Sequence, residues 1–183
     1  LFAIIAILKI IDAEKLKGYV FAMFHKSFLE DELREDTSFF SSFYSLLFLF
    51  SCTVLALIMS LLISERNESF SFSFSFFLLV LGIIFSYFTL KSILELLIVR
   101  LFLINKQVRF YVVSKFGHLY SVSFFLLVLF VLFQFGPLNF SFFITIASGF
   151  FFLNFVFHVF NNKKLVFSKL FYYILYLCAF EIS

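Results

Sequence analysis

Long apolar stretches separated by short polar segments dominate the pattern of this 183-residue chain. An α-helix rises about 1.5 Å per residue, so about twenty apolar residues cross the roughly 30 Å hydrocarbon core of a bilayer. Five stretches reach or approach that length with few charges, namely 39–63, 70–90, 119–135, 138–160 and 165–183. The pattern therefore predicts an all-α, polytopic membrane protein with five full transmembrane helices.

The first 38 residues predict two further elements. Residues 1–11 are apolar except for Lys9, but eleven residues rise only about 16 Å. We interpret them as the end of a transmembrane helix that begins before the given chain. Residues 12–38 mix charges with Tyr and Phe at spacings of three and four, which favours a helix in the membrane interface. We expect a single integral-membrane domain over residues 1–183, cut within helices at both ends.

Local patterns refine the boundaries of the spans. The run FSFSFSFF from Phe70 alternates as a β-strand does. An isolated strand cannot satisfy its backbone hydrogen bonds in lipid, so we interpret this run as the first turns of a helix that continues through Arg100. Gly136 and Pro137 predict a tight turn between two spans. Gly149, which follows the small residues Ala147 and Ser148, would allow a close approach of two helices.

Composition narrows the class of protein. Apolar residues make up 63% and charged residues 14% of the chain, whereas soluble domains carry about 25% charged residues. A water-soluble chain this apolar would expose aggregation-prone patches, so lipid is the expected solvent. The 36 Phe residues are attributed partly to AT-rich codons. Cys52 and Cys178 lie in spans far apart, which is typical of buried, reduced thiols.

The charges between the spans predict an orientation. If the spans alternate in direction, residues 12–38, 91–118 and 161–164 share one side of the membrane. Counted together with Lys9 and Lys169, which lie near the same ends, that side holds thirteen of the fourteen Lys and Arg residues, and the other side holds only Arg66. Basic loops face the cytoplasm in most membrane proteins, so this side is predicted to be cytoplasmic. Basic residues that flank spans do not indicate a nucleic-acid partner.

Four polar residues in or beside the predicted spans are candidates for function. Glu181 lies about 24 Å from the cytoplasmic end of the last span. An ionisable side chain at that depth is costly, so we treat Glu181 as a candidate functional residue. A structural hydrogen bond is the alternative. Glu95 lies four residues after Lys91 and shares a helix face with it. Glu95 either forms a surface ion pair with Lys91 near the headgroups or is a buried functional carboxylate. Asn154 and His158, four residues apart, favour interhelical hydrogen bonding over substrate contact.

A cluster of acidic residues precedes the first full span. It is either a solvated face or a docking site for a basic partner, and it comprises Glu30, Asp31, Glu32, Glu35 and Asp36. The three His residues fall near the predicted cytoplasmic face, but no two have the spacing of a metal motif. The chain has no phosphate-binding loop, no Ser/His/Asp series and no CxxC motif. We therefore expect no catalytic, metal or cofactor site.

The end of the chain carries a run that is informative beyond its hydropathy. KLFYYILYLCAFEIS, residues 169–183, resembles the C-terminal LYLC-x-x-EI signature of an uncharacterised integral-membrane family of Bacteroidota. Residues 28–51 and 88–122 are similar to that family's first conserved helix and its central segment. The resemblance thus covers nearly the whole chain. It implies no assigned activity, but it implies a bacterial inner membrane and a chain longer than this one.

Three classes of function remain open. The first is a non-catalytic accessory or scaffold subunit of a larger inner-membrane complex in cell-envelope secretion, motility or respiration. Short loops and the acidic cluster favour it. The second is a small transporter or ion-pathway component that uses an intramembrane carboxylate. The third is a lipid-modifying enzyme, which would need clustered His or acidic residues at one interface. An organelle-encoded respiratory subunit would have a similar composition. We favour the first class, with the bilayer and protein subunits as partners.

Overall fold

The computed structural model describes residues 1–22, 28, 42–66, 73–101, 105–137 and 139–161. Within its helices, the side chains of residues 66, 95–101, 105–113, 154 and 158–161 are not described. All regular structure in these ranges is helical, as the hydrophobic pattern predicts. Four of the described helices are long and apolar enough to cross a membrane. The predicted fifth span, 165–183, lies outside the described residues.

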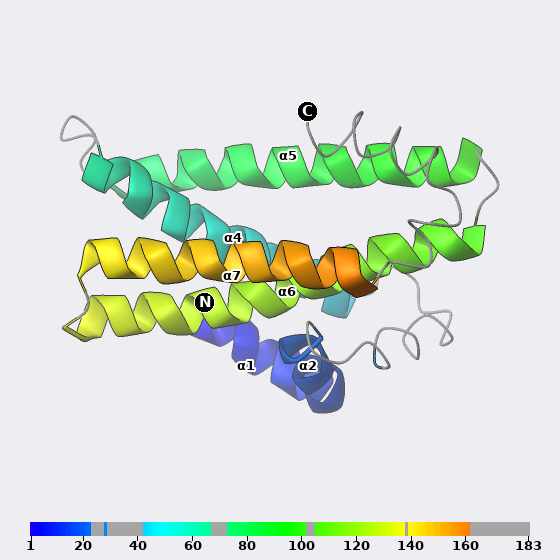
Figure 1. Cartoon of the computed structure of the whole chain (residues 1–183). Helices are drawn as coiled ribbons and strands as arrows, with labels where there is room; N and C mark the ends of the chain where they lie inside the picture. The colour runs from blue at the N-terminus through cyan, green and yellow to red at the C-terminus, as the bar shows by residue number, and fades with distance from the viewer. Residues whose placement is uncertain (23–27, 29–41, 67–72, 102–104, 138, 162–183) are drawn as a thin grey trace.

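Four long helices form an up-and-down bundle (Figure 1). They are α4 (Ser42–Arg66), α5 (Phe74–Leu101), α6 (Asn105–Phe135) and α7 (Phe140–Asn161). Consecutive helices run in opposite directions, so the α4–α5 and α6–α7 connections lie at one end of the bundle and the α5–α6 connection lies at the other. Their membrane-spanning parts are Ser42–Glu65, Phe74–Leu94, Ser114–Phe135 and Phe140–Phe157.

The structure confirms the predicted order of these spans and changes the meaning of the basic stretch 91–118. The predicted spans 39–63, 70–90, 119–135 and 138–160 each overlap one of these spans. α5 continues to Leu101, as predicted, and α6 begins at Asn105. Most of the basic stretch is therefore helical, and its basic residues lie on the ends of two helices. Hydropathy marks where the membrane ends, whereas intrahelical hydrogen bonds carry a helix beyond it.

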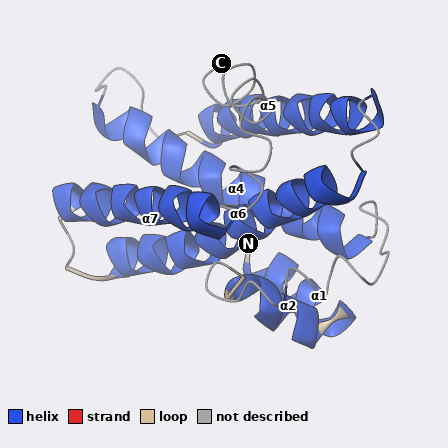
Figure 2. Cartoon of the chain, turned by 45° about the vertical axis from the view of Figure 1, so that its right-hand side comes forward, coloured by secondary structure: helices blue, strands red, loops and turns tan. Residues whose placement is uncertain are grey.

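Two short helices precede the bundle. α1 (Phe2–Ile11) and α2 (Ala13–Val20) meet at Asp12, whose extended backbone turns the chain. The Asp12 carboxylate accepts a hydrogen bond from the Lys15 backbone N–H at 2.9 Å and so caps α2. α1 packs against α4, and α2 packs against α6 (Figure 2). The predicted interfacial helix over 12–38 is thus described only in its first part, as α2.

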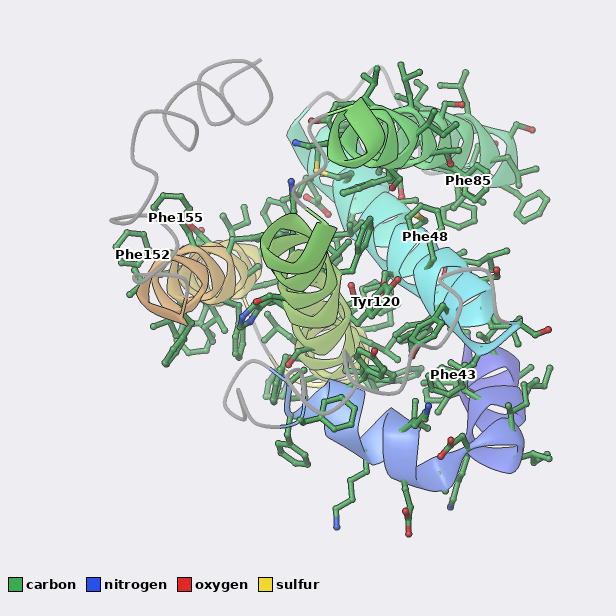
Figure 3. All side chains as sticks on the ribbon, turned by 90° about the vertical axis from the view of Figure 1, so that its right-hand side faces the viewer. Phe43, Phe48, Phe85, Tyr120, Phe152 and Phe155 are labelled. Carbon is green, nitrogen blue, oxygen red and sulfur yellow. The ribbon has the colours of Figure 1, made fainter. Side chains whose placement is uncertain are left out.

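α4 and α6 form the centre of the bundle. Half of the residues in the apolar windows of these two helices are buried. Viewed along the bundle, α6 lies among α7, α4 and the N-terminal helices (Figure 3). The Phe50 and Phe124 rings pack with their centroids 4.7 Å apart, and Phe48 joins α4 to both Phe85 of α5 and Phe116 of α6. Aromatic packing therefore holds the central helices together.

α5 and α7 form the outer layer and expose apolar side chains. Only 6% of the apolar window of α5 and 12% of that of α7 is buried. Ile83 and Leu90 of α5 are about 60% exposed, at 61% and 62%, and Phe152 and Phe155 of α7 point away from the bundle (Figure 3). Such a surface is unfavourable in water and is what the lipid-facing side of a membrane bundle presents. The molecule is therefore an integral membrane protein.

The two glycine predictions have different outcomes. α6 ends at Phe135, and the Gly136 N–H donates to the Leu132 carbonyl at 2.9 Å. A Cβ at position 136 would collide with that carbonyl oxygen, so the turn requires glycine and the predicted turn is confirmed. A Cβ at Gly149 would meet no atom within 4 Å. No described helix packs closely at Gly149, so the predicted close approach there stays a prediction, while the neighbouring Ala147 is buried.

Candidate functional site

The residues that the sequence singled out are not brought together by the described part of the structure. Glu181 and the acidic cluster 30–36 lie outside the described residues. Glu95 lies on α5, and Asn154 and His158 lie on α7, but their side chains are not described. Their proposed roles stay predictions. The described interior contains other polar groups, and these define the candidate site.

Three polar residues form a buried row on α6, which we call the α6 polar row. Ser114, His118 and Ser121 follow one another at spacings of four and three, so they lie on one face of the helix. Each is at most 1% exposed. Small polar side chains between membrane helices allow close approach and supply hydrogen bonds that lipid cannot. The row therefore marks a face of α6 that is covered by protein.

Ser121 connects the α6 polar row to the N-terminal helices. Its hydroxyl donates a hydrogen bond of 2.7 Å to the backbone carbonyl of Val20. Val20 is the last residue of α2, and the last carbonyls of a helix have no partner within the helix. The hydroxyl thus caps α2 from a helix about one hundred residues away in the chain. This bond orients α2 across the face of α6.

His118 lies deeper than the sequence suggested. The prediction placed it near the cytoplasmic face, outside a span that began at residue 119. The span of α6 begins at Ser114, and the His118 side chain is 1% exposed. An ionisable side chain within a span is a functional candidate by default, and interhelical hydrogen bonding is its simpler role. His118 thus lies about one turn inside the span. The predicted span began five residues later because Lys115 and His118 are polar.

Small polar residues of α4 serve mainly their own helix. The Ser60 hydroxyl donates to the Leu57 carbonyl at 2.9 Å, and the Thr53 hydroxyl donates to the Phe50 carbonyl at 2.7 Å. Such bonds satisfy a hydroxyl in an apolar interior without a second helix. Cys52 is a free, buried cysteine, as predicted. The two hydroxyl groups therefore stabilise α4 in the membrane interior.

An aromatic cluster surrounds Tyr19, and sequence reasoning missed it. The Tyr19 ring contacts the rings of Phe28, Phe43, Tyr44 and Tyr120, with centroids 5.1, 6.2, 6.0 and 5.7 Å away. These contacts join α2 to both α4 and α6, and Figure 3 shows Phe43 and Tyr120 between those helices. Tyrosine is the usual residue at such half-polar positions, but no local pattern pairs residue 19 with residue 120.

The described groups favour binding and packing over catalysis. The α6 polar row and the cluster around Tyr19 supply hydroxyl, imidazole and aromatic groups in a closed interior. In the part of the chain that the structure describes, no three His, Cys, Asp or Glu residues are placed to hold a metal ion. The arrangement can orient helices and can accept a hydrogen-bonding group.

Comparison with known proteins places the chain in a family without an assigned role. No curated protein and no solved structure matches it. One family model matches residues 1–183, the whole chain, and its description is a domain of unknown function. This agrees with the resemblance to an uncharacterised family that the segments 28–51, 88–122 and 169–183 carry. With its entire length matched, the chain belongs to the family described as Domain of unknown function (DUF4271).

Proposed function

We propose that this protein is a non-catalytic accessory or scaffold subunit of a larger membrane assembly, such as one of cell-envelope secretion, motility or respiration. The unequal burial of its spans carries the proposal. α4 and α6 are packed within the chain, whereas α5 and α7 leave most of their surface to the surroundings. Those outer faces are available to lipid and to the helices of other subunits.

One feature of α5 favours a partner helix over lipid alone. Gly82 and Ser86 are exposed and lie four residues apart, on one face of the helix. A Cβ added at Gly82 would meet no atom within 4 Å. Membrane helices approach each other closely where two small residues have this spacing. A transmembrane helix of a partner subunit is the occupant that we propose for this face.

The substitution Gly82→Leu tests the partner on α5. The leucine fills open space and improves helix propensity, so the unfolding temperature of the purified chain should not fall. Recovery of co-purifying subunits in mild detergent should fall severalfold. Gly149→Leu is the comparison on α7, where Thr145 and Gly149 are also exposed and four residues apart and where the added side chain also meets open space. Loss of subunits from Gly82→Leu alone would assign the contact to α5. An unchanged set of subunits in the Gly82→Leu variant would rule out this face.

The acidic cluster is proposed as a second contact, with a soluble or peripheral partner. Reversing the charges of Glu30, Asp31, Glu32, Glu35 and Asp36 should release a basic partner without unfolding the protein. Exposed charge contacts are screened over about 8–10 Å at ordinary ionic strength, so the native contact should also weaken in high salt. Co-purification that survives both treatments would argue for a solvated face without a docking role.

We further propose a bacterial inner membrane as the location, with the α5–α6 end of the bundle in the cytoplasm. Lys91, Arg100, Lys106, Arg109 and Lys115 all lie on α5 and α6 near that end. The opposite end has Arg66 as its basic residue. This asymmetry supports the orientation through the positive-inside rule.

An ion pathway is the second candidate, and the α6 polar row supports it. His118 is enclosed within a span, between two buried serines. Pathway residues in membrane proteins are polar groups that face the interior of the bundle. The carboxylates Glu95 and Glu181 are proposed to act with it. Proton or cation flux into liposomes that hold the purified chain tests this role. Flux that persists in a folded His118→Ala variant, or no flux at all, excludes it.

A further inference from the structure

The end of the bundle where α5 and α6 meet carries cations at two heights. The span of α5 ends at Leu94 and that of α6 begins at Ser114, but the helices themselves continue to Leu101 and from Asn105. At about 1.5 Å per residue, they continue roughly 10 Å and 13 Å beyond their apolar windows. The outer cations are Arg100, Lys106 and Arg109, and the inner ones are Lys91 and Lys115.

The two inner lysines share one depth. Lys91 and Lys115 each lie twelve residues from residue 103, the middle of the connection between the two antiparallel helices. Lys91 lies within the last turn of its span, and Lys115 directly follows the first residue of its span. The headgroup layer extends about 5–8 Å beyond the hydrocarbon core. Both ammonium groups therefore belong at the boundary between hydrocarbon and headgroups.

The surroundings of Lys91 fit a phosphate at that depth. The residue is partly buried and follows Ile84 and Phe88, which pack against the core, at spacings of four and three. Its Nζ lies 3.5 Å from the Tyr87 hydroxyl and 5.7 Å from the centroid of that ring. An ammonium group is costly in hydrocarbon, so its long stem directs it towards the headgroups. Tyrosine is also favoured at this level of the membrane.

We propose that Lys91 and Lys115 form a binding site for the phosphodiester group of an anionic phospholipid. An ammonium group donates three hydrogen bonds and acts as a compact positive charge. Leu90, Ile93 and Leu94 beside Lys91 are 62%, 50% and 39% exposed, so an acyl chain has apolar surface directly next to the charge. That combination selects a lipid over a soluble phosphate, which would leave the apolar surface uncovered.

Titration of the full chain in non-ionic detergent tests the site. Fluorescent short-chain phosphatidylglycerol should bind more tightly than phosphatidylcholine with the same chains. A basic residue near a membrane surface contributes about 1 kcal/mol, or about fivefold in affinity. Lys91→Gln with Lys115→Gln should therefore weaken phosphatidylglycerol binding about 25-fold and leave phosphatidylcholine binding unchanged. The arginine pair, Lys91→Arg with Lys115→Arg, should retain the preference because the charges remain.

Matched controls separate the site from net charge. Lys9→Gln with Lys17→Gln removes two exposed lysines of α1 and α2, and should change the affinity less than twofold. An equal loss in this control would overturn the proposal, as would equal affinities of the two lipids for the unmodified chain. Displacement by glycerol phosphate at the concentration of the lipid would also overturn it, since the site would then bind a soluble anion. The lipid preference of the unmodified chain decides the outcome even if the glutamine pair fails to fold.

Discussion

Ser121 illustrates how single polar residues act in this interior. Its hydroxyl donates to the last carbonyl of α2 at 2.7 Å, whereas the Ser123 hydroxyl, two residues on, donates to the Leu119 carbonyl of its own helix at 2.9 Å. Both side chains are fully buried. Removal of the Ser121 hydroxyl takes a hydrogen bond from the Val20 carbonyl, which lies at the end of another helix. Removal of the Ser123 hydroxyl affects the Leu119 carbonyl, which still accepts the backbone hydrogen bond of its own helix. Similar residues at similar depth thus have different roles.

We expect Ser121→Ala to destabilise the docking of α2 more than Ser123→Ala does. Hydrogen bonds between membrane helices contribute about 0.6 kcal/mol on average and at most about 1.7 kcal/mol. The loss for Ser121→Ala should fall in this range, and that for Ser123→Ala should be close to zero. Unfolding by a denaturing detergent measures both. Equal losses would mean that the bond to Val20 has no energetic weight.

Glu181 calls for a different pair of substitutions. A carboxylate within a span costs about 2.5–3.5 kcal/mol at the centre of the bilayer, so it must be partnered, hydrated or protonated. If its role is structural, Glu181→Gln keeps fold and function, and Glu181→Leu destabilises the protein by about 1–2 kcal/mol because its partners lose a hydrogen bond. Unfolding and subunit recovery measure both outcomes. A well-folded Glu181→Gln variant that has lost proton or cation flux into liposomes would favour the ion-pathway role.

At the scale of elements, hydropathy predicted the spans and missed how the helices continue and pack. The run FSFSFSFF has the alternation of a strand, yet α5 begins at Phe74 within it, because a lone strand has no backbone partners in lipid. The start of α6 at Asn105 was not predicted. The residues from Asn105 to Ser114 include several polar ones, so hydropathy does not mark them as part of the helix. The contact of Tyr19 with Tyr120 had no local signal.

Tyr19 is expected to hold α2 against the bundle. Its ring touches residues of both α4 and α6, and the side chain is 2% exposed. Truncation of a buried aromatic residue to Ala costs about 3–5 kcal/mol, which exceeds what a two-turn helix can recover by itself. Tyr19→Ala should therefore release α2 while α4–α7 stay folded. Phe21→Ala removes an aromatic residue that is 44% exposed and serves as the control.

Hydrogen exchange of the α2 backbone amides measures this release. Exchange should accelerate strongly in Tyr19→Ala and stay nearly unchanged in Phe21→Ala, while the amides of α4 remain protected in both variants. Loss of protection throughout the bundle would show that the cluster around Tyr19 stabilises the whole fold and not only the docking of α2.

At the scale of the molecule, the sequence predicted an alternating membrane bundle but could not rank its helices by burial. All four described spans are comparably apolar, because lipid and protein interior are equally apolar surroundings for a helix. Only packing distinguishes α4 and α6, which are half buried, from α5 and α7, which are mostly exposed. The small polar residues give a partial signal in retrospect. Buried serines gather on α4 and α6, at positions 51, 60, 114, 121 and 123.

The topology of the whole bundle can be tested by labelling single cysteines from either side of the membrane. The positive-inside rule places the α5–α6 end, with its five basic residues, in the cytoplasm. A single cysteine at Lys163 follows α7 at that end and should react with an impermeant maleimide only after the cell is opened. A cysteine at Glu68 follows α4 at the opposite end and should react in intact cells. Cys52 is buried and should stay unlabelled, while Cys178 is replaced by Ser beforehand. The reverse pattern would invert the bundle. Labelling of both cysteines from one side would require an even number of crossings between them. It would therefore exclude the described up-and-down arrangement, in which three helices, α5, α6 and α7, separate the two positions.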